Sequence, residues 1–486
     1  MLLFSIFWHT LAHFYAILFY IDYKKGKKMK KLLLILSLML GLANTTHAEP
    51  LTPTQLHAVL GVVTNFILDD GITHNGTSYG TVTSPYTGRV WLDRNLGASK
   101  VCTSLADTGC YGDYYQWGRN ADGHHKRNSF DYPILASNVT NVEHGDFITN
   151  GTAPYDWASV DATGVRRFIN WTATDGSSVC PTGFRVPASA ELQAELFDAG
   201  SAEIQNSTDA FNSFLKVPSA GFRSGNNGAI DQLGNEGYLW SSLANGTGSS
   251  MALFFPNFAV WITNGYRSYG RSVRCIKAKT HKHNGTTYGE VISPYTGKVW
   301  LDRNLGAKRV CTSLDDTECY GDYYQWGRNA DGHEKSTSSS TSARASNITN
   351  VGHENFITTT TSPRDWASVD LAGAGRTANW SATDGSSVCP TGFRVPNIAE
   401  LQAELLDVDS AQIANNTDAF NSFLVLPSVG YRSNDSGALN LQGSWGGVWS
   451  SSVSGSYSRY VYFFSGSADS SNEYRARGFT VRCLRD

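Results

Sequence analysis

Most of the chain is a duplication. Residues 74–123 and residues 283–332 are identical at 42 of 50 positions, at a constant offset of 209 residues. A repeat of about 200 residues is far longer than the ~20–50 residues of a solenoid unit or propeller blade, and it matches the length of a whole domain. The sequence therefore predicts two tandem copies of one domain, over residues 74–277 and 283–486, joined by a linker over residues 278–282.

The composition is typical of a turn-rich protein with a preference for β-structure. Charged residues make up only 17% of the chain, whereas it contains 47 Gly, 13 Trp, 23 Tyr and 23 Phe. Residues 1–48 carry six Lys and one Asp, a surplus of five positive charges, so the net charge of −3 leaves about −8 on the remainder. An acidic chain without a basic stripe excludes nucleic acid as the expected partner.

The N-terminal region resembles a targeting segment. Basic residues at Lys30 and Lys31 precede an apolar run over residues 32–42 and a small residue, Ala48, so we expect a signal peptide over residues 29–48. Residues 1–28 are either a membrane segment or an extension upstream of the true start, and membrane contact is expected only through an uncleaved N-terminus. Residues 49–73 form an appendage with a short helix. The predicted location is periplasmic, secreted or cell-surface.

Eight Cys residues agree with that location, because four fall in each repeat. Four Cys allow three pairings per repeat. A short turn-rich segment favours closure of Cys102 on Cys110, which leaves Cys180 for Cys275, and the second repeat would follow with Cys311–Cys319 and Cys389–Cys483. A zinc site is the alternative, but no pair has CxxC spacing and no His lies at ligand spacing.

Each repeat is expected to be an α+β domain, loop-rich and held by disulfides. In the first repeat we expect a hairpin over residues 79–93, a buried aromatic segment over 111–119 and long loops over 124–170. Helices are predicted over residues 188–198, with Glu191 and Glu195 on the polar face, and over 209–215. Four short strands are predicted over residues 220–223, 238–242, 252–255 and 272–275.

Several strings occur in the same order in both copies. The first copy carries VWLDRNLGA, GDYYQWGR, CPTGFRVP, PSAGFRS, YLWSS and SVRC, and the second carries VWLDRNLGA, GDYYQWGR, CPTGFRVP, PSVGYRS, VWSS and TVRC. They resemble the Fibrobacter succinogenes major paralogous domain family over nearly all of both repeats. The resemblance implies a C-type-lectin-like fold, distantly related to the formylglycine-generating enzyme domain, on secreted and surface proteins of bacteria. It informs the fold much more than the function.

The shared strings favour structural roles for most of their polar and aromatic residues. The Trp residues are predicted to lie in the core, at positions 91, 117, 240, 300, 326 and 449. Asp93, Arg94 and Asn95 predict a turn with a buried ion pair, and Arg185 and Arg394 are also predicted to be structural. His124 and His125 are expected to be solvated.

Neither a metal site nor a catalytic site is predicted, and no cofactor is expected. The Glu-Pro-Asn, Gln-Pro-Asp and Trp-Asn-Asp strings of calcium-dependent lectins do not occur in the sequence. Asp107, Asp113 and Asp122 are the remaining candidates for a structural calcium. The sequence also lacks HExxH, GxSxG and P-loop motifs, so we expect no enzymatic activity.

The two copies differ most within residues 243–263 and 452–471, and again within 126–135 and 335–344. A fixed framework with changed loops is how binding modules vary specificity. We therefore expect a binding or adhesion protein that recognises an extracellular glycan or protein, with contact candidates Asn245, Met251, Phe258, Trp261, Tyr457, Arg459, Tyr460 and Tyr462. Drift of surface loops, an enzyme on a related scaffold, and a structural cell-envelope component remain the alternatives.

Overall fold

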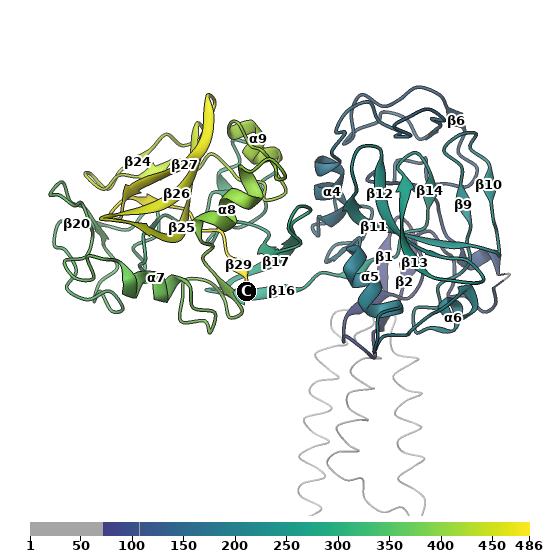
Figure 1. Cartoon of the computed structure of the whole chain (residues 1–486), viewed down its shortest axis with the longest axis horizontal. Helices are drawn as coiled ribbons and strands as arrows, with labels where there is room; N and C mark the ends of the chain where they lie inside the picture. The colour runs from purple at the N-terminus through teal and green to yellow at the C-terminus, as the bar shows by residue number, and fades with distance from the viewer. Residues whose placement is uncertain (1–70, 106) are drawn as a thin grey trace, which may run out of the picture. The chain divides into compact units, whose positions relative to one another are not determined.

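The computed structural model describes residues 71–105 and 107–486 (Figure 1). These residues form many short β-strands and few helices, so the expected mixture of strands and helices is confirmed. No helix among them is long and apolar enough to cross a membrane. The predicted signal peptide, the segment before it and the helix expected within residues 49–73 lie outside the described residues, except that residues 72–73 belong to the first strand pair.

The first repeat contains three main sheets. One has the strand order β3-β4-β15-β8 and joins the start of the repeat to its end, and a second has the order β10-β9-β14-β5. The third is an antiparallel sheet, β11-β12-β13, drawn in teal in Figure 1. Its strands span Gly237–Ala244, Ser249–Phe255 and Trp261–Tyr266. The remaining strands are β1 (Ile72–His74), β2 (Thr77–Tyr79), β3 (Thr81–Thr83), β4 (Val90–Leu92), β5 (Tyr115–Gln116), β6 (Asp131–Tyr132), β7 (Phe147–Ile148), β8 (Phe184–Arg185), β9 (Phe222–Arg223), β10 (Ile230–Asp231), β14 (Gly270–Arg271) and β15 (Ile276–Lys277).

The second repeat has the same three sheets, as β16-β17-β18-β29-β22, β19-β28-β23-β24 and β25-β26-β27. The third spans Trp445–Ser454, Tyr457–Phe464 and Ser467–Tyr474. The other strands are β16 (Thr280–His283), β17 (Thr286–Ile292), β18 (Val299–Leu301), β19 (Tyr324–Gln325), β20 (Ser340–Thr341), β21 (Phe356–Ile357), β22 (Phe393–Arg394), β23 (Tyr431–Arg432), β24 (Leu439–Asn440), β28 (Gly478–Phe479) and β29 (Leu484–Arg485).

Two expected boundaries change. Most of the expected linker, residues 280–282, belongs to β16, which pairs with β17 of the second repeat. The strand expected over residues 272–275 instead connects β14 to β15. The predicted hairpin is confirmed, since Thr81 of β3 lies opposite Leu92 of β4.

Three helices occur in each repeat. The first has α4 (Val165–Thr172), α5 (Ser189–Leu196) and α6 (Ser207–Asn212), and the second has α7 (Ala374–Trp380), α8 (Ile398–Leu405) and α9 (Asn416–Asn421). Both predicted helices are therefore present, but α4 begins inside a segment that was expected to be loop. Leu192 and Leu196 are buried as expected. Glu195 is buried too, against expectation, because it accepts hydrogen bonds from the side chains of Ser84, Thr87 and Trp91.

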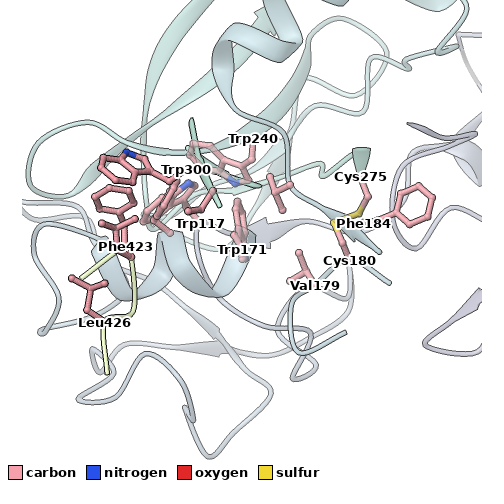
Figure 2. Packing of buried hydrophobic residues seen from close by; sticks show 14 of the residues in the cluster. Trp117, Trp171, Val179, Cys180, Phe184, Trp240, Cys275, Trp300, Phe423 and Leu426 are labelled. Atoms are coloured by element: carbon pink, nitrogen blue, oxygen red, sulfur yellow. A yellow bond between two sulfur atoms is a disulfide. The ribbon is translucent and has the colours of Figure 1, made fainter. Parts of the chain in front are cut away.

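Large aromatic side chains fill the core. Figure 2 shows Trp117 and Trp171 near Trp240, with the Cys180–Cys275 disulfide between Val179 and Phe184. All six Trp residues predicted to be core are fully buried. The four predicted disulfides are confirmed as well, namely Cys102–Cys110, Cys180–Cys275, Cys311–Cys319 and Cys389–Cys483. Such bonds are typical of proteins that fold outside the cytoplasm.

A buried charge cluster joins the long loop of each repeat to its third sheet. In the first repeat Arg167 donates two hydrogen bonds to Asp156, at 2.5 and 2.8 Å, and Arg267 donates a third at 3.3 Å. Arg267 also donates to the carbonyl of Gly246 in the β11–β12 turn. Asp365, Arg376 and Arg475 repeat the arrangement in the second repeat, where Arg475 donates to the Gly455 carbonyl.

The domain boundary yields a testable prediction. A fragment over residues 280–486 keeps β16, both disulfides and all three sheets, so it should fold alone and melt in one cooperative transition when it is produced in an oxidising compartment. Circular dichroism during heating would measure this transition. A matched fragment over residues 284–486 lacks β16 and should melt at a lower temperature. Equal melting temperatures would show that β16 does not belong to the second repeat.

A second prediction concerns the charge cluster. Asp156→Ala leaves Arg167 and Arg267 buried without their carboxylate, so it should lower the free energy of unfolding of the first repeat by about 3–5 kcal/mol. Asp365→Ala is the matched variant for the second repeat. In urea unfolding of the full chain, each substitution should move one transition and leave the other in place. A shift below about 1 kcal/mol in both would contradict a stabilising role for the cluster.

Candidate functional site

The segments in which the two copies differ most are strands rather than loops. Residues 243–263 cover the end of β11, all of β12 and the start of β13, together with the two turns that join them. Residues 452–471 cover the corresponding part of β25, β26 and β27. The expected loop site is therefore a three-stranded sheet with two short turns. Only the turns and the outward side chains of this sheet are free to vary at low cost.

Strand register aligns the two sheets. Ala252 lies opposite Trp240, and Tyr460 lies opposite Trp449, so the offset between the copies is 208 residues here rather than 209. The missing residue falls in the first turn. Four residues separate β11 from β12, and two separate β25 from β26, but β25 ends one residue later than its counterpart, so one residue is missing in all. Phe254 therefore corresponds to Tyr462, and Trp261 corresponds to Asp469.

The two faces of the sheet have different roles. Leu253 and Phe255 of β12 pack against Leu192 and Leu196 of α5 in one buried cluster. Successive side chains of a strand point to opposite faces, so Phe254 points away from this helix. It stacks on Tyr238 of β11, with ring centroids 4.5 Å apart. The helix-covered face belongs to the scaffold, and the opposite face carries an aromatic surface.

In the first repeat the aromatic rings form a continuous series, which we call the first row. It begins in the β12–β13 turn and crosses the third sheet to β9 and to the segment after β13. The ring centroids of successive members lie between 4.4 and 6.5 Å apart, and the members in order are Phe258, Trp261, Phe254, Tyr238, Phe222, Tyr269, Tyr266 and Tyr155.

Exposure varies along the first row. Phe258 is 75% exposed, Tyr266 45% and Trp261 38%, whereas Tyr238 is only 9% exposed. Burial raises the pKa of Tyr238 well above its ordinary value, and its hydroxyl donates to Glu236 at 2.7 Å. The first row therefore combines exposed ring faces at its ends with a fixed, buried ring at its centre.

The second repeat has a shorter counterpart, which we call the second row. Phe464, Tyr462, Trp445 and Tyr431 follow one another at 5.7 to 6.5 Å, and Arg477 lies over the Tyr431 ring at 4.6 Å. Trp445 and Tyr462 are stacked, with 3° between their planes. The second row reuses the same sheet face with different residues.

The predicted contact residues of the first copy separate into two groups. Phe258 and Trp261 belong to the first row. Asn245 is exposed in the β11–β12 turn, where its side chain bonds to Asn264. Met251 lies on the opposite, helix-covered face, and the hydroxyl of Ser189 in α5 is 3.6 Å from its sulfur.

The predicted residues of the second copy also separate. Tyr462 belongs to the second row, and Tyr457 is 38% exposed beside Tyr474 at the end of the β25–β26 hairpin. Tyr460 is only 7% exposed because it packs on Phe479 and Trp449, so it presents little surface to a ligand.

Arg459 lies on the other face of β26 from Tyr460. Its guanidinium bonds to Ser470, which also accepts a hydrogen bond from Gln402 of α8. Of the predicted contact residues, Phe258 and Trp261 belong to the first row and Tyr462 belongs to the second row. Met251, Arg459 and Tyr460 belong to neither row.

Sequence reasoning missed the scaffold members of both rows. Phe222 and Tyr238 lie in strings that the copies share, PSAGFRS and YLWSS, and comparison of the copies directs attention away from them. A signal was present nonetheless. The position is aromatic in both copies, as Phe222 and as Tyr431, although the residue itself changes.

The His and Asp clusters that could hold a metal are already satisfied. Asp122, His124 and His125 lie together, as do Asp331, His333 and Glu334. Nδ1 of His124 donates to Asp122, and Nε2 accepts from the backbone N–H of Gln116. His333 is bonded in the same way, to Asp331 and Gln325. Both imidazole nitrogens are therefore used within the protein.

These histidines are buried, not solvated as expected. His124 and His333 are fully buried and His125 is 5% exposed, stacked on the Tyr115 ring at 4.9 Å. Burial lowers the pKa of His124 and of His333 to about 4. Burial lowers the pKa of His125 to about 3, and His124 adds to this shift.

The three Asp residues considered for calcium have separate partners. Asp107 caps the 3-10 helix η1 (Thr108–Cys110) and pairs with Lys100 at 3.0 Å. Asp113 pairs with Lys126 at 2.7 Å, and Asp122 pairs with Arg119 at 2.7 Å. The predicted structural roles of Arg185 and Arg394 are supported, because each forms a bidentate pair with a Glu of the following helix.

A pocket of about 390 Å³ occurs in the second repeat, lined by Arg328, Asp331 and residues 348–354 among others. Its buried charges are occupied, since Arg328 donates to Asp331 and Asp331 also bonds His333. Among the described residues no Cys is free, so none supplies a thiol nucleophile. The aromatic rows are therefore the surfaces with the clearest capacity to hold a ligand.

Comparison with known proteins identifies no relative of this chain. No family model matches the chain, and no curated protein and no solved structure shows a significant match. The resemblance to the paralogous domain family rests on the shared strings alone.

The buried histidines yield a prediction for acid stability. Their folded pKa values lie below the ordinary value of about 6.5, so the stability of the neutral form is fully present above pH 6.5 and is lost as the pH falls toward 4. The first repeat has two such groups and the second has Glu334 in place of His125. His125→Glu should therefore reduce the fall in melting temperature of the first repeat between pH 7 and pH 4.5, measured by circular dichroism. An unchanged fall would mean that His125 is protonated in the folded state.

Proposed function

We propose that this chain is a secreted or surface-exposed bacterial binding protein with two C-type-lectin-like domains, each of which recognises a carbohydrate through its aromatic row. The single observation that carries the proposal is the continuity of the rows, in which each ring centroid lies within 6.5 Å of the next. Extended exposed apolar patches on soluble proteins mark interaction sites. Isolated surface aromatics are common and would carry no such argument.

The chemistry of the rows favours a saccharide. The face of an aromatic ring carries negative charge density and attracts the weakly positive C–H groups on the flat face of a sugar ring. The first row offers several such faces in a series, which suits a chain of sugar rings. Buried partners fix Tyr238 and Tyr462, so little side-chain entropy is lost when a ligand binds.

The duplicated scaffold fits this reading. The disulfides and the Asp156 and Asp365 clusters are the same in both copies, whereas the rows differ in most members. A frame that is kept while its surface changes is expected of a module whose ligand preference varies. Two sites on one chain also increase avidity for a polymer that both can reach.

Substitutions in the rows test the proposal. On a glycan array, the secreted chain should bind a subset of the printed glycans. Phe258→Ala with Trp261→Ala should weaken the binding of the first repeat about 30-fold, as expected for loss of a hot-spot pair. Tyr462→Ala with Phe464→Ala should act similarly on the second repeat.

The matched control is Tyr86→Ala. Tyr86 is 47% exposed, but it packs against Phe214 on the helix side of the domain, so its loss should leave glycan binding unchanged. If both double variants bind glycans as the wild type does, the site lies elsewhere. If the wild-type chain binds proteins but no glycan, the ligand is a protein and the carbohydrate proposal is wrong.

A further inference from the structure

Arg271 is a buried cation without a hydrogen-bond partner. It ends β14, is 8% exposed, and its guanidinium lies 4.4 Å from the Tyr238 ring and 4.6 Å from the Trp240 ring. Its Nε and Nη1 atoms are enclosed and make no hydrogen bond to any described residue. A guanidinium has five N–H donors, and buried donors of native proteins are nearly always paired.

Other buried arginines of the same repeat differ sharply from Arg271. Arg167 and Arg267 share Asp156, and Arg274 donates to Asn95 and to the carbonyl of Leu215. Among the described buried arginines of this repeat, only the side chain of Arg271 makes no hydrogen bond.

Glu236, the carboxylate that bonds Tyr238, does not pair with Arg271. Glu236 accepts the hydroxyl of Tyr238 at 2.7 Å and forms no ion pair with the guanidinium. Burial lowers the pKa of Arg271 to about 10, which still leaves it charged at neutral pH. The first row thus contains a permanent positive charge at its centre that no anionic side chain of the described residues balances by direct contact.

Gly265 of β13 makes room for this charge. A Cβ atom at Gly265 would lie 2.3 Å from Nη1 of Arg271 and 2.7 Å from the Trp240 ring. In the second repeat the register places Glu473 at the position of Gly265 and Phe479 at the position of Arg271. There Phe479 packs against Trp449, with ring centroids 4.6 Å apart, and Glu473 pairs with Arg477 at 2.6 Å.

The two positions therefore differ together. Gly265 with Arg271 leaves a cation without a partner, whereas Glu473 with Phe479 fills the same place with an apolar ring and a charge pair that is complete within the protein. Burying an unpaired cation costs free energy. Because the second repeat folds without this cation, we infer that the first repeat keeps it for binding a ligand.

We propose that Arg271 recognises a carboxylate on the ligand of the first row, and that this ligand is a saccharide containing uronic acid residues. The inference rests on the proposed carbohydrate binding and deepens it. A carboxylate is a strong acceptor for guanidinium N–H groups, and Nη2 is the guanidinium nitrogen of Arg271 that is not enclosed. The second row, with Phe479 at this place, takes a saccharide without that charge.

Arg271→Met is the decisive variant, because Met keeps an unbranched, apolar side chain at this position and removes the charge. A glycan array with uronate-bearing, sulfated and neutral glycans, probed with the full secreted chain, should show selective loss of uronate binding. We expect a fall of on the order of tenfold to hundredfold, the range for lost hydrogen bonds to a charged group. Arg271→Phe, which copies the second repeat, should behave in the same way.

The melting temperature separates a ligand-binding role from a structural one. Replacing an unpaired buried charge with an apolar side chain should leave the melting temperature of Arg271→Met unchanged or raise it. Phe479→Met in the second repeat is the matched control and should leave uronate binding intact. A lowered melting temperature with parallel loss of all binding would make Arg271 structural and overturn the inference.

The remaining outcomes distinguish this inference from the proposed function. Uronate binding that survives in Arg271→Met, binding by the wild type only to neutral glycans, or binding only to sulfated glycans would each overturn the assignment of a carboxylate to Arg271 and leave carbohydrate binding in place. A wild-type chain that binds no glycan of any class would overturn both.

Discussion

The fold depends on a buried carboxylate that two guanidiniums share. Asp156 lies in a long irregular segment and holds Arg167 of α4 and Arg267 at the end of β13, while both cations lie over the Trp117 ring. An ion pair in a dry interior is stable only when its geometry is complete. Here carbonyl groups of Asp161, Ala162 and Gly246 accept the other donors. The cluster therefore ties this segment, which also has a small apolar cluster around Trp157, to α4 and to the third sheet.

This constraint explains why the third sheet can vary on one face only. Arg267 reaches the carbonyl of Gly246 and so fixes the β11–β12 turn, and α5 covers the inner face through Leu192 and Leu196. Arg475 and Gly455 keep the same link in the second repeat, although the turn is shorter there. On the outer face Trp240 and Ala252 are buried too, and only the exposed row members such as Phe258 and Trp261 lack such ties. Substitution there changes the surface without disturbing the frame, and it is on this face that the two copies differ in most ring positions.

Sequence patterns predicted the elements whose signals are local. Leu192 and Leu196 mark α5 by their spacing, Cys counts per repeat give the disulfides, and β3 and β4 flank an obvious turn. The patterns failed where distant partners decide burial. Glu195 looks like a polar helix position, but Ser84, Thr87 and Trp91 from the hairpin supply its hydrogen bonds. The helix α4 was missed because Arg167 lies beside Phe168 and Trp171 on its buried face, and this Arg hides the apolar periodicity until Asp156 is known to meet it.

The candidate site shows the same division between local and distant information. Comparison of the copies located Phe258, Trp261 and Tyr462 because these residues lie where the sequences diverge. It could not locate Tyr238 or Phe222, which lie in strings that the copies share, or Arg271, which lies outside the divergent segments.

The charges of the two rows have moved rather than disappeared between the copies. The first copy has Arg271 at the centre and Tyr155 at the rim beside Tyr266, whereas the second has Phe479 at the centre and Arg364 at the rim, 4.8 Å from the Tyr474 ring. A central charge enclosed by rings acts strongly on one group of a ligand, because the surroundings are of low dielectric. A rim charge in solvent acts weakly and is screened by salt. Duplication followed by such an exchange produces two sites with different demands. Linking them on one chain increases affinity only for a surface that presents both kinds of ligand, since a polymer that satisfies one row leaves the other unoccupied.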